Sequence, residues 1–258
     1  MPDTHDVANF DLSGRTALVT GSSTGLGKAM AYAMGRAGAR IAINYANNSE
    51  RAEATLGEFR SDGIECELFP ADITDESEVD QLCDSIGSKL GPIDILVLNA
   101  AANQYLSPIE EYDWHFHQLM LDFFVRSPYL LARRILPHMK QQGWGRIISI
   151  GSEVFYQGRS HFSAYVAAKG AQNGWSRSMA RELAPDGITV NMLSPGWIPV
   201  ERHADASDEA RQGYADTVPV GRIGVPADMG GAAVFLSSES ASFINGQNIH
   251  VDGGRSVH

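Results

Sequence analysis

The sequence has few cysteines, no long apolar run and too few basic residues to balance its acids. Its two cysteines, Cys66 and Cys83, lie far apart and lack the spacing of a metal or redox motif. No apolar stretch approaches the ~20 residues that span a bilayer. The formal net charge of −11 argues against a surface for nucleic acid or anionic lipid. These absences argue against a nucleic-acid or membrane partner and say nothing more specific about what the protein binds.

The chain has 258 residues, of which 43% are hydrophobic and 20% charged. This composition suits either one large α/β domain or two small ones. The first residues, 1–11, are polar and lack the basic-then-apolar order of a signal peptide. We therefore expect a flexible N-terminal tail over 1–11, a folded chain over 12–258 and a cytoplasmic location.

Short apolar runs alternate with helix-like segments along the folded part. The segment 108–142 has an apolar, aromatic middle and is expected to form a helix kinked at Pro128. The polar segment 201–219 is interpreted as a mobile lid or an inert surface excursion. The alternation predicts an α/β fold, a single-domain doubly wound parallel seven-stranded sheet of the Rossmann-like type. Its expected strands are 16–20, 40–45, 65–70, 93–98, 145–150, 188–193 and 244–251.

A glycine-rich turn follows the first expected strand and precedes a helical run. Strand, glycine turn and helix is the arrangement that places phosphate oxygens at a helix N-terminus. Gly21 permits a tight turn, Gly25 lets the backbone approach a pyrophosphate, and Gly27 permits close packing of helix on strand. The spacing of these glycines is wider than in the usual dinucleotide fingerprint, but its position predicts a dinucleotide site.

The end of the second expected strand bears on the choice of cofactor. An acid at this point would hold the 2′-hydroxyl of NAD and repel a 2′-phosphate. Residues 44–49 contain no acid, and the nearest acid and base are Glu50 and Arg51. The missing repulsion favours NADP, with NAD still possible. The alternative is that these polar residues form only a surface turn.

Two further polar residues follow strand ends. Asp72 is placed to accept a hydrogen bond from an adenine amino group, or to cap the helix that begins near Asp75. Asn99 precedes small residues that leave room for a ribose or a flat ring. Its amide is equally suited to joining adjacent strands.

Tyr165 and Lys169 are four residues apart and share one face of a helix. A nearby ammonium favours the phenolate and lowers the pKa of a tyrosine, which helps it to exchange a proton near neutral pH. Ser152 follows the fifth expected strand and brings a hydroxyl toward the same point. A tyrosine–lysine pair of this spacing is common on helix surfaces, so the interpretation depends on the motifs around it.

Together these motifs resemble a classical short-chain dehydrogenase/reductase, over about residues 12–254. The ending, residues 246–254, resembles the 3-oxoacyl-carrier-protein reductase-like branch. The resemblance implies that Tyr165 is the acid/base, that Lys169 assists it and holds the nicotinamide ribose, and that Ser152 binds the substrate oxygen. It also implies a cofactor-binding set: Gly21, Ser23, Thr24, Gly25, Leu26, Gly27, Tyr45, Asn47, Asn48, Asp72, Ile73, Asn99, Ala100, Ala101, Tyr165, Lys169, Pro195, Gly196 and Ile198.

The chain departs from this family at its fourth catalytic position. The family places an asparagine there, about four residues before Pro128, where this chain has Phe124. A phenyl ring cannot hold the water that normally links the lysine to solvent. We expect the chemistry to survive with another water path, past Asp122 or a backbone carbonyl. Ala101, where the family commonly has glycine, adds a methyl group beside the cofactor.

The sequence thus predicts an oxidoreductase that transfers a hydride between NADP(H) and a carbonyl or secondary alcohol. The alternative is a non-catalytic nucleotide-binding regulatory or scaffold protein of the same fold, motivated by Phe124 and Ala101. The resemblance further implies a homotetramer. No metal site is expected, because His115 and His117 are two apart and do not share a helix face. The expected substrate pocket is partly aromatic, lined by Phe155, Tyr156, His161, Phe162 and Trp197.

Overall fold

A computed structural model describes residues 9–257 of the chain. The expectation of a flexible tail falls largely on residues 1–8, which lie outside the described residues. Asn9 is described, and its carbonyl accepts a hydrogen bond from the Ser240 hydroxyl at 3.0 Å. Within 9–257, no helix is long and apolar enough to cross a membrane.

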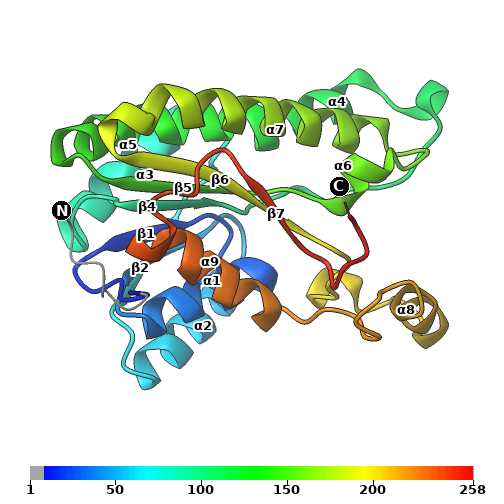
Figure 1. The fold of residues 1–258 in the computed structure, drawn as a ribbon, viewed down its shortest axis with the longest axis horizontal. Helices are drawn as coiled ribbons and strands as arrows, with labels where there is room; N and C mark the ends of the chain where they lie inside the picture. The colour runs from blue at the N-terminus through cyan, green and yellow to red at the C-terminus, as the bar shows by residue number, and fades with distance from the viewer. Residues whose placement is uncertain (1–8, 258) are drawn as a thin grey trace.

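Seven parallel strands form one sheet in the order β3-β2-β1-β4-β5-β6-β7 (Figure 1), which confirms the predicted fold. The central strands β1 and β4 are buried along their whole length, as expected for a sheet that is covered on both faces. β6 continues to Pro195, beyond the predicted end. The strands are β1 Thr16–Val19, β2 Arg40–Tyr45, β3 Cys66–Pro70, β4 Ile95–Leu98, β5 Gly145–Ile150, β6 Ile188–Pro195 and β7 Asn248–Val251.

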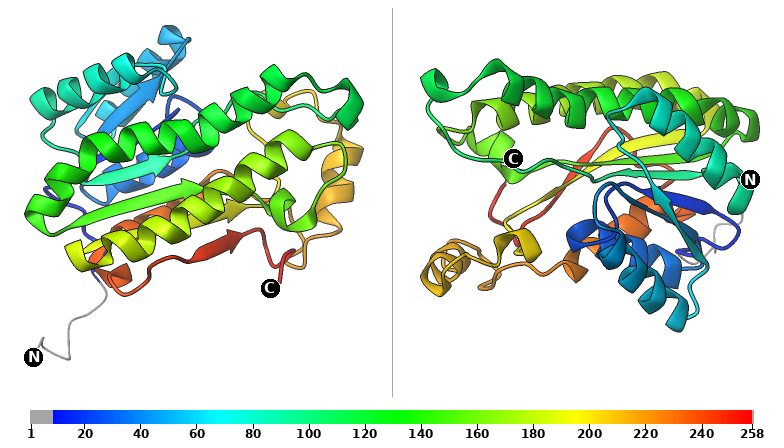
Figure 2. Two further views of the ribbon diagram at one scale, coloured as in Figure 1. Left: turned by 90° about the horizontal axis from the view of Figure 1, so that it is seen from above. Right: turned by 180° about the vertical axis from the view of Figure 1, so that it is seen from behind.

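Helices cover the two faces of the sheet in separate layers (Figures 1 and 2). One layer holds α1 Gly25–Arg36, α2 Ser49–Ser61 and α9 Ala227–Ser237. The other holds α3 Glu76–Lys89, α5 Ser127–Gln142 and α7 Ser163–Leu183. Each layer buries its own apolar cluster against the sheet, so both the nucleotide turn before α1 and the tyrosine on α7 start from rigid supports.

The predicted helix over 108–142 is broken, and not by Pro128. Pro128 lies in the first turn of α5, where its missing N–H has little effect. The irregularity is a π turn, η2 Asp122–Arg126, in which the Ser127 amide donates to the Asp122 carbonyl. The segment consists of η1 Ile109–Glu111, α4 Trp114–Leu121, the π turn and α5. The π turn directs Phe124 inward, where it is only 2% exposed.

Short helices complete the edge of the sheet above the strand ends. α6 Glu153–Gln157 separates Ser152 from α7 and ends at Gly158, which has a left-handed φ of 59°. The predicted lid contains η4 Glu201–His203 and α8 Asp208–Ala215, seen apart from the helical layers in Figure 1. The remaining short helices are η3 Ala184–Asp186 and η5 Glu239–Ala241.

Candidate active site

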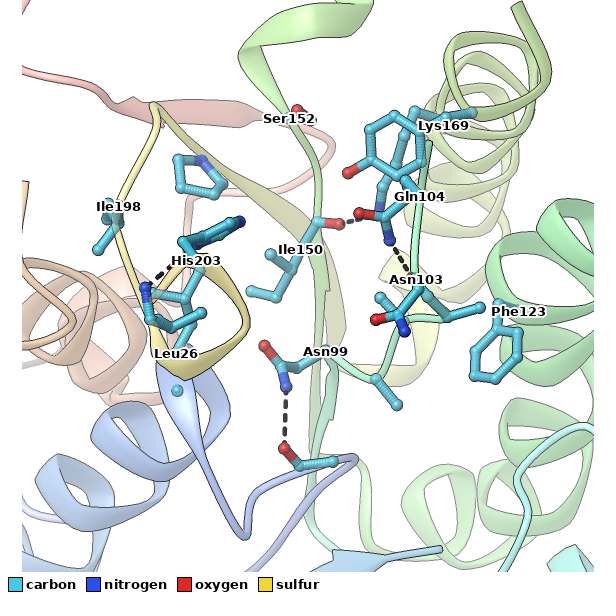
Figure 3. Close-up of a pocket in the computed structure, with 18 of the residues that line it drawn as sticks. Leu26, Asn99, Asn103, Gln104, Phe123, Ile150, Ser152, Lys169, Ile198 and His203 are labelled. Atoms are coloured by element: carbon cyan, nitrogen blue, oxygen red, sulfur yellow. Dashed lines mark hydrogen bonds between the residues drawn. The ribbon is translucent and has the colours of Figure 1, made fainter. Parts of the chain in front are cut away.

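A cavity of about 1600 Å³ opens at the carboxyl ends of the strands, beneath α8 and beside α7 (Figure 3). Ligands of doubly wound sheets bind at this edge. All the predicted catalytic and cofactor residues line the cavity except Gly27 and Asn48. Residues far apart in sequence therefore meet in one site, as their order along the chain predicted.

The glycine turn is shaped for close approach of another molecule. Gly21 and Gly25 have φ values of +64° and +58°, which favour glycine. Gly27 lies behind the turn, where an added Cβ would lie 2.7 Å from the Gly21 carbonyl oxygen and would also collide with the Asn99 amide. Asn99 donates from Nδ2 to the Thr20 carbonyl at 2.9 Å, so its strand-joining role is present and it also lines the cavity.

Donors at the N-terminus of α1 lower the pKa of a nearby carboxyl group, that of Glu201. Burial alone would raise the pKa of the Glu201 carboxyl. Backbone amides at this point, its own and that of Gly25, lower this pKa overall, and the charge of Arg51 adds to the effect. A carboxylate is thus stabilised where donors and the helix dipole meet. The residues present therefore fit a pyrophosphate at this point.

The adenosine end of the cavity is polar. Asn44 is buried at the end of β2 and accepts from the Gly21 amide at 3.1 Å, while its Nδ2 donates to the carbonyls of Phe69 in β3 and Ala71 just after it. Asn48 caps α2 through the Arg51 amide and lies outside the cavity lining. Asp72 lines the cavity but does not cap α3, because Asp75 accepts from the Glu78 amide instead.

The three predicted catalytic side chains share the centre of the cavity. Ser152 ends the loop after β5, and its Oγ accepts from the Val154 amide at 3.3 Å. The Tyr165 ring lies between those of Phe124 and Phe162, with centroid separations of 5.4 and 5.0 Å. The Lys169 ammonium lies 5.6 Å from the Tyr165 ring centre. The two side chains, one helical turn apart, therefore lie on the same side of α7.

Lys169 is almost completely buried, with 4% of its surface exposed. Its ammonium donates to the Ile150 carbonyl at 2.6 Å (Figure 3) and to Gln172 Oε1 at 3.0 Å. It also lies 3.7 Å from the centre of the Phe124 ring. Asp122, one of the two water paths expected, does not line the cavity, and its carboxylate accepts from Gln118 instead. Of the two groups expected beside the lysine, only a backbone carbonyl contacts it.

The substrate side of the cavity contains a network that sequence reasoning missed. The buried Glu153 carboxylate accepts from Arg255 at 2.6 Å and from the Tyr214 hydroxyl at 3.0 Å. The same hydroxyl accepts from the Trp197 amide at 2.6 Å. The four residues come from α6, the chain end, α8 and the loop after β6, so no local pattern connects them.

The expectation of a partly aromatic substrate pocket is only partly correct. Phe162 and Trp197 line the cavity, whereas Phe155, Tyr156 and His161 do not. His161 is exposed and has a left-handed φ of 58°, and its carbonyl accepts from Ser107 and Tyr112. Polar side chains also line the cavity near Phe162, namely Asn103, Gln104, Gln157, Arg159 and Ser160. Within residues 9–257, no cluster of three metal-ligating side chains is present.

Comparison with known proteins identifies the family. Residues 21–256 match the family model described as enoyl-(acyl carrier protein) reductase. The chain is 34% identical to the 3-oxoacyl-[acyl-carrier-protein] reductase FabG of Staphylococcus aureus, over 93% of this chain and 97% of that one.

Two solved structures extend the likeness to three dimensions. A putative gluconate dehydrogenase from Agrobacterium tumefaciens is 37% identical, with a TM-score of 0.92 over 98% of this chain and all of that one. A gluconate 5-dehydrogenase from Burkholderia cenocepacia, solved with NADP and tartrate, is 33% identical with a TM-score of 0.88, over 96% and 98% of the chains. The expectation of NADP as cofactor is confirmed by such neighbours. The chain belongs to the classical short-chain dehydrogenase/reductases, in the 3-oxoacyl-carrier-protein reductase-like branch, and is an oxidoreductase dependent on a nicotinamide nucleotide.

Proposed function

We propose that the protein interconverts a carbonyl and a secondary alcohol at Ser152, Tyr165 and Lys169, with NADP(H) as the cofactor. The observation that carries the proposal is that these three side chains line one cavity with the glycine turn before α1. The nicotinamide, when bound, supplies or accepts the hydride. Pro195, Gly196 and Ile198 line the same cavity and are the proposed contacts of its ring.

The chain's own residues manage the proton and the developing charge. In reduction, the Tyr165 phenol gives its proton to the substrate oxygen as negative charge develops there. The Ser152 hydroxyl donates a hydrogen bond to the same oxygen and orients the carbonyl. The Lys169 ammonium favours the phenolate that remains. In oxidation, the phenolate takes the proton back.

A direct assay tests these roles. Purified protein with NADPH and a panel of ketones should oxidise the nucleotide, and Tyr165→Phe should reduce turnover by roughly 10²–10⁴-fold with NADPH binding retained. Unchanged turnover in this variant would remove Tyr165 from the acid/base role. The second candidate function is a non-catalytic nucleotide-binding protein. It predicts that the protein binds NADPH but that no ketone in the panel causes NADPH oxidation, and no observation in the structure favours it.

NADP is preferred through the end of β2. Tyr45 and Asn47 line the cavity there, no acid lies within 44–49, and Arg51 lines the same wall from the first turn of α2. A guanidinium at this point favours a 2′-phosphate. Arg51→Met should weaken NADPH binding about tenfold and leave NADH binding unchanged, as measured by fluorescence titration. Equal losses for both nucleotides would contradict this role.

The substrate is proposed to be a small polar hydroxy or keto acid. Arg255 is paired with Glu153, whereas Arg159 has no carboxylate partner among residues 9–257. The Arg159 guanidinium lies 5.7 Å from the Phe162 ring, which in turn lies 5.0 Å from the Tyr165 ring. A cation is therefore available near the acid/base residue. Two similar structures carry gluconate dehydrogenase names, which agrees with an acidic substrate.

The negative charge of a hydroxy or keto acid distinguishes it from a neutral substrate of similar shape. Arg159→Met should lower kcat/KM for a keto acid about tenfold, the effect of ~1.4 kcal/mol, and leave kcat/KM for the matching amide unchanged. Arg177→Met removes an exposed arginine that does not line the cavity and serves as the control. Equal rates for the acid and its amide in the unaltered protein would exclude the proposed class.

A homotetramer in the cytoplasm is the proposed assembly and location. Phe243 is fully exposed and Val257 is 88% exposed, near the edge strand β7, while Trp114 and Tyr129 are exposed on the helical layer. Exposed large apolar side chains on two faces suit two interfaces. The Phe124 side chain is buried within its own subunit and belongs to neither face. Light scattering of the purified protein measures the number of subunits.

A further inference from the structure

A buried glutamine lies beside the catalytic lysine. Gln172 is 1% exposed, and its Oε1 accepts from the Lys169 ammonium at 3.0 Å. It lies on the face of α7 that carries Lys169 and Ser176, both also buried. A buried amide is retained where its polar atoms find partners, because an unpaired one is costly. The partner here is a charged group of the proposed catalytic machinery.

The surroundings of Lys169 are fixed on three sides. Two of the three N–H groups of its ammonium are committed, to the Ile150 carbonyl and to Gln172. The face of the Phe124 ring lies 3.7 Å from the ammonium and excludes solvent there. At most one N–H therefore remains for a ribose hydroxyl, for Tyr165 or for a water. A lysine held in this way cannot serve the family's water relay and bind both ribose hydroxyls as well.

We propose that Gln172 is a positioning residue that holds Lys169 charged and aligned beside Tyr165, replacing the support lost where Phe124 stands in place of an asparagine. This inference rests on the proposed function. The π turn carries Phe124, whose ring lies against the lysine, and α7 carries Gln172, whose amide oxygen accepts from it. The two residues together substitute an aromatic face and an amide oxygen for a bound water.

The electrostatic setting makes the effect specific to Tyr165. From α7, Tyr165 is a titratable group close to the ammonium, and β5 presents the Ile150 carbonyl. From the π turn, Asp122 is engaged by Gln118, and Arg126 donates to the Thr74 carbonyl. Loss of the Gln172 acceptor would leave a buried ammonium less stabilised, so the amine would lose its proton more easily. A neutral amine no longer favours the phenolate.

Gln172→Met tests the inference, because methionine has a similar length and no acceptor oxygen. Ionisation of Tyr165 is followed by ultraviolet difference titration against the same protein carrying Tyr165→Phe. We expect the pKa of Tyr165 to rise by about one unit, which is a tenfold change in its ionisation equilibrium. At neutral pH kcat in the oxidation direction should fall about tenfold, with the KM of the alcohol unchanged. Phe124→Asn added to Gln172→Met should recover most of the loss.

Ser176→Ala is the matched control. Ser176 is one turn beyond Gln172 on α7, about two turns from Lys169, and is equally buried. Its hydroxyl donates to Ser149, so the variant loses a buried hydrogen bond as well. This variant should change neither the pKa of Tyr165 nor kcat. The inference is overturned if the pKa of Tyr165 is unchanged in a folded Gln172→Met protein. It is also overturned if this pKa shifts by the same amount in Ser176→Ala. If the unaltered protein turns over no substrate but the titration moves as expected, the proposed function fails and the positioning role stands.

Discussion

The nucleotide half and the substrate half of the cavity are built in different ways. The nucleotide half consists of backbone and small residues, with the turn from Gly21 to Gly27 packed on Asn99 and Asn44. The substrate half consists of long side chains, among them Glu153, Tyr214 and Arg255, which reach one another from separate segments. The first half is fixed by conformations that only glycine adopts easily, and the second by tertiary contacts.

This difference explains where the family pattern is kept and where it changes. A glycine turn has few alternatives, because an added Cβ strikes backbone or a neighbouring amide. Side chains around Tyr165 have more freedom, since one set of contacts with Lys169 can replace another. The exchange of an asparagine for Phe124, with Gln172 beside it, lies on this more permissive side.

Among changes that test this comparison of the two halves, the largest expected effect comes from filling the space behind the glycine turn. Gly27→Ala should lower the free energy of unfolding by about 1–3 kcal/mol, because its Cβ meets the Gly21 carbonyl and the Asn99 amide. NADPH affinity should fall at least about tenfold, as the turn and Asn99 shift. Chemical denaturation and nucleotide titration measure the two effects.

Gly57→Ala is the control for this change, since a Cβ on Gly57 of α2 meets nothing within 4 Å. It should raise the free energy of unfolding by up to ~1 kcal/mol through helix propensity alone. If Gly27→Ala behaved in the same way, the nucleotide half would not depend on the close packing of its turn.

A smaller effect, confined to the other half, is expected of Tyr214→Phe. The change leaves the Trp197 amide without its partner and removes one donor from Glu153, at a local cost of about 1–3 kcal/mol. Burial, aided by the Glu153 carboxylate and opposed by the Trp197 amide, raises the pKa of Tyr214 to about 12, so the hydroxyl remains a donor at assay pH. KM for the substrate should rise by roughly threefold to tenfold.

Steady-state kinetics check this prediction, with NADPH affinity expected to stay unchanged. Tyr32→Phe is the matched control, because Tyr32 also donates to a carboxylate, Asp62 at 2.9 Å, but on the exposed side of α1. An equal change in NADPH affinity and in KM would show that the two halves are not independent.

The smallest effect concerns Glu201, at the border of the two halves. Hydrogen bonds hold the pKa of Glu201 below its ordinary value of 4.5 despite its partial burial, so its contribution to stability is present above that pH. It is lost as the pH falls through the lowered pKa. The contribution is below about 1 kcal/mol, because the carboxyl is largely exposed to solvent.

Thermal unfolding of the nucleotide-free protein between about pH 3 and pH 6 measures this contribution, and Glu201→Gln should flatten the curve. The same variant should bind NADPH slightly more tightly, because a phosphate no longer competes with a carboxylate for the N-terminus of α1. Identical pH curves for the two proteins would mean that Glu201 does not occupy the anion site.

Much of the site was predictable because it is local or ordered by topology. The seven strands and the glycine turn were read from short patterns, and parallel strands bring their carboxyl ends to one edge. Tyr165 and Lys169 meet because one helical turn separates them. The break in 108–142 was misjudged at Pro128, because a π turn depends on the packing of Phe124 against α7 rather than on a local signal.

The sequence by itself determined the parallel fold, the place of the nucleotide turn and the spacing of the tyrosine and lysine, since each depends on backbone geometry and short-range periodicity. Only the tertiary structure decided what surrounds Lys169 and how Glu153, Tyr214 and Arg255 close the substrate side. Those contacts join residues far apart in the chain. Their strength comes from burial and charge, which no short pattern encodes.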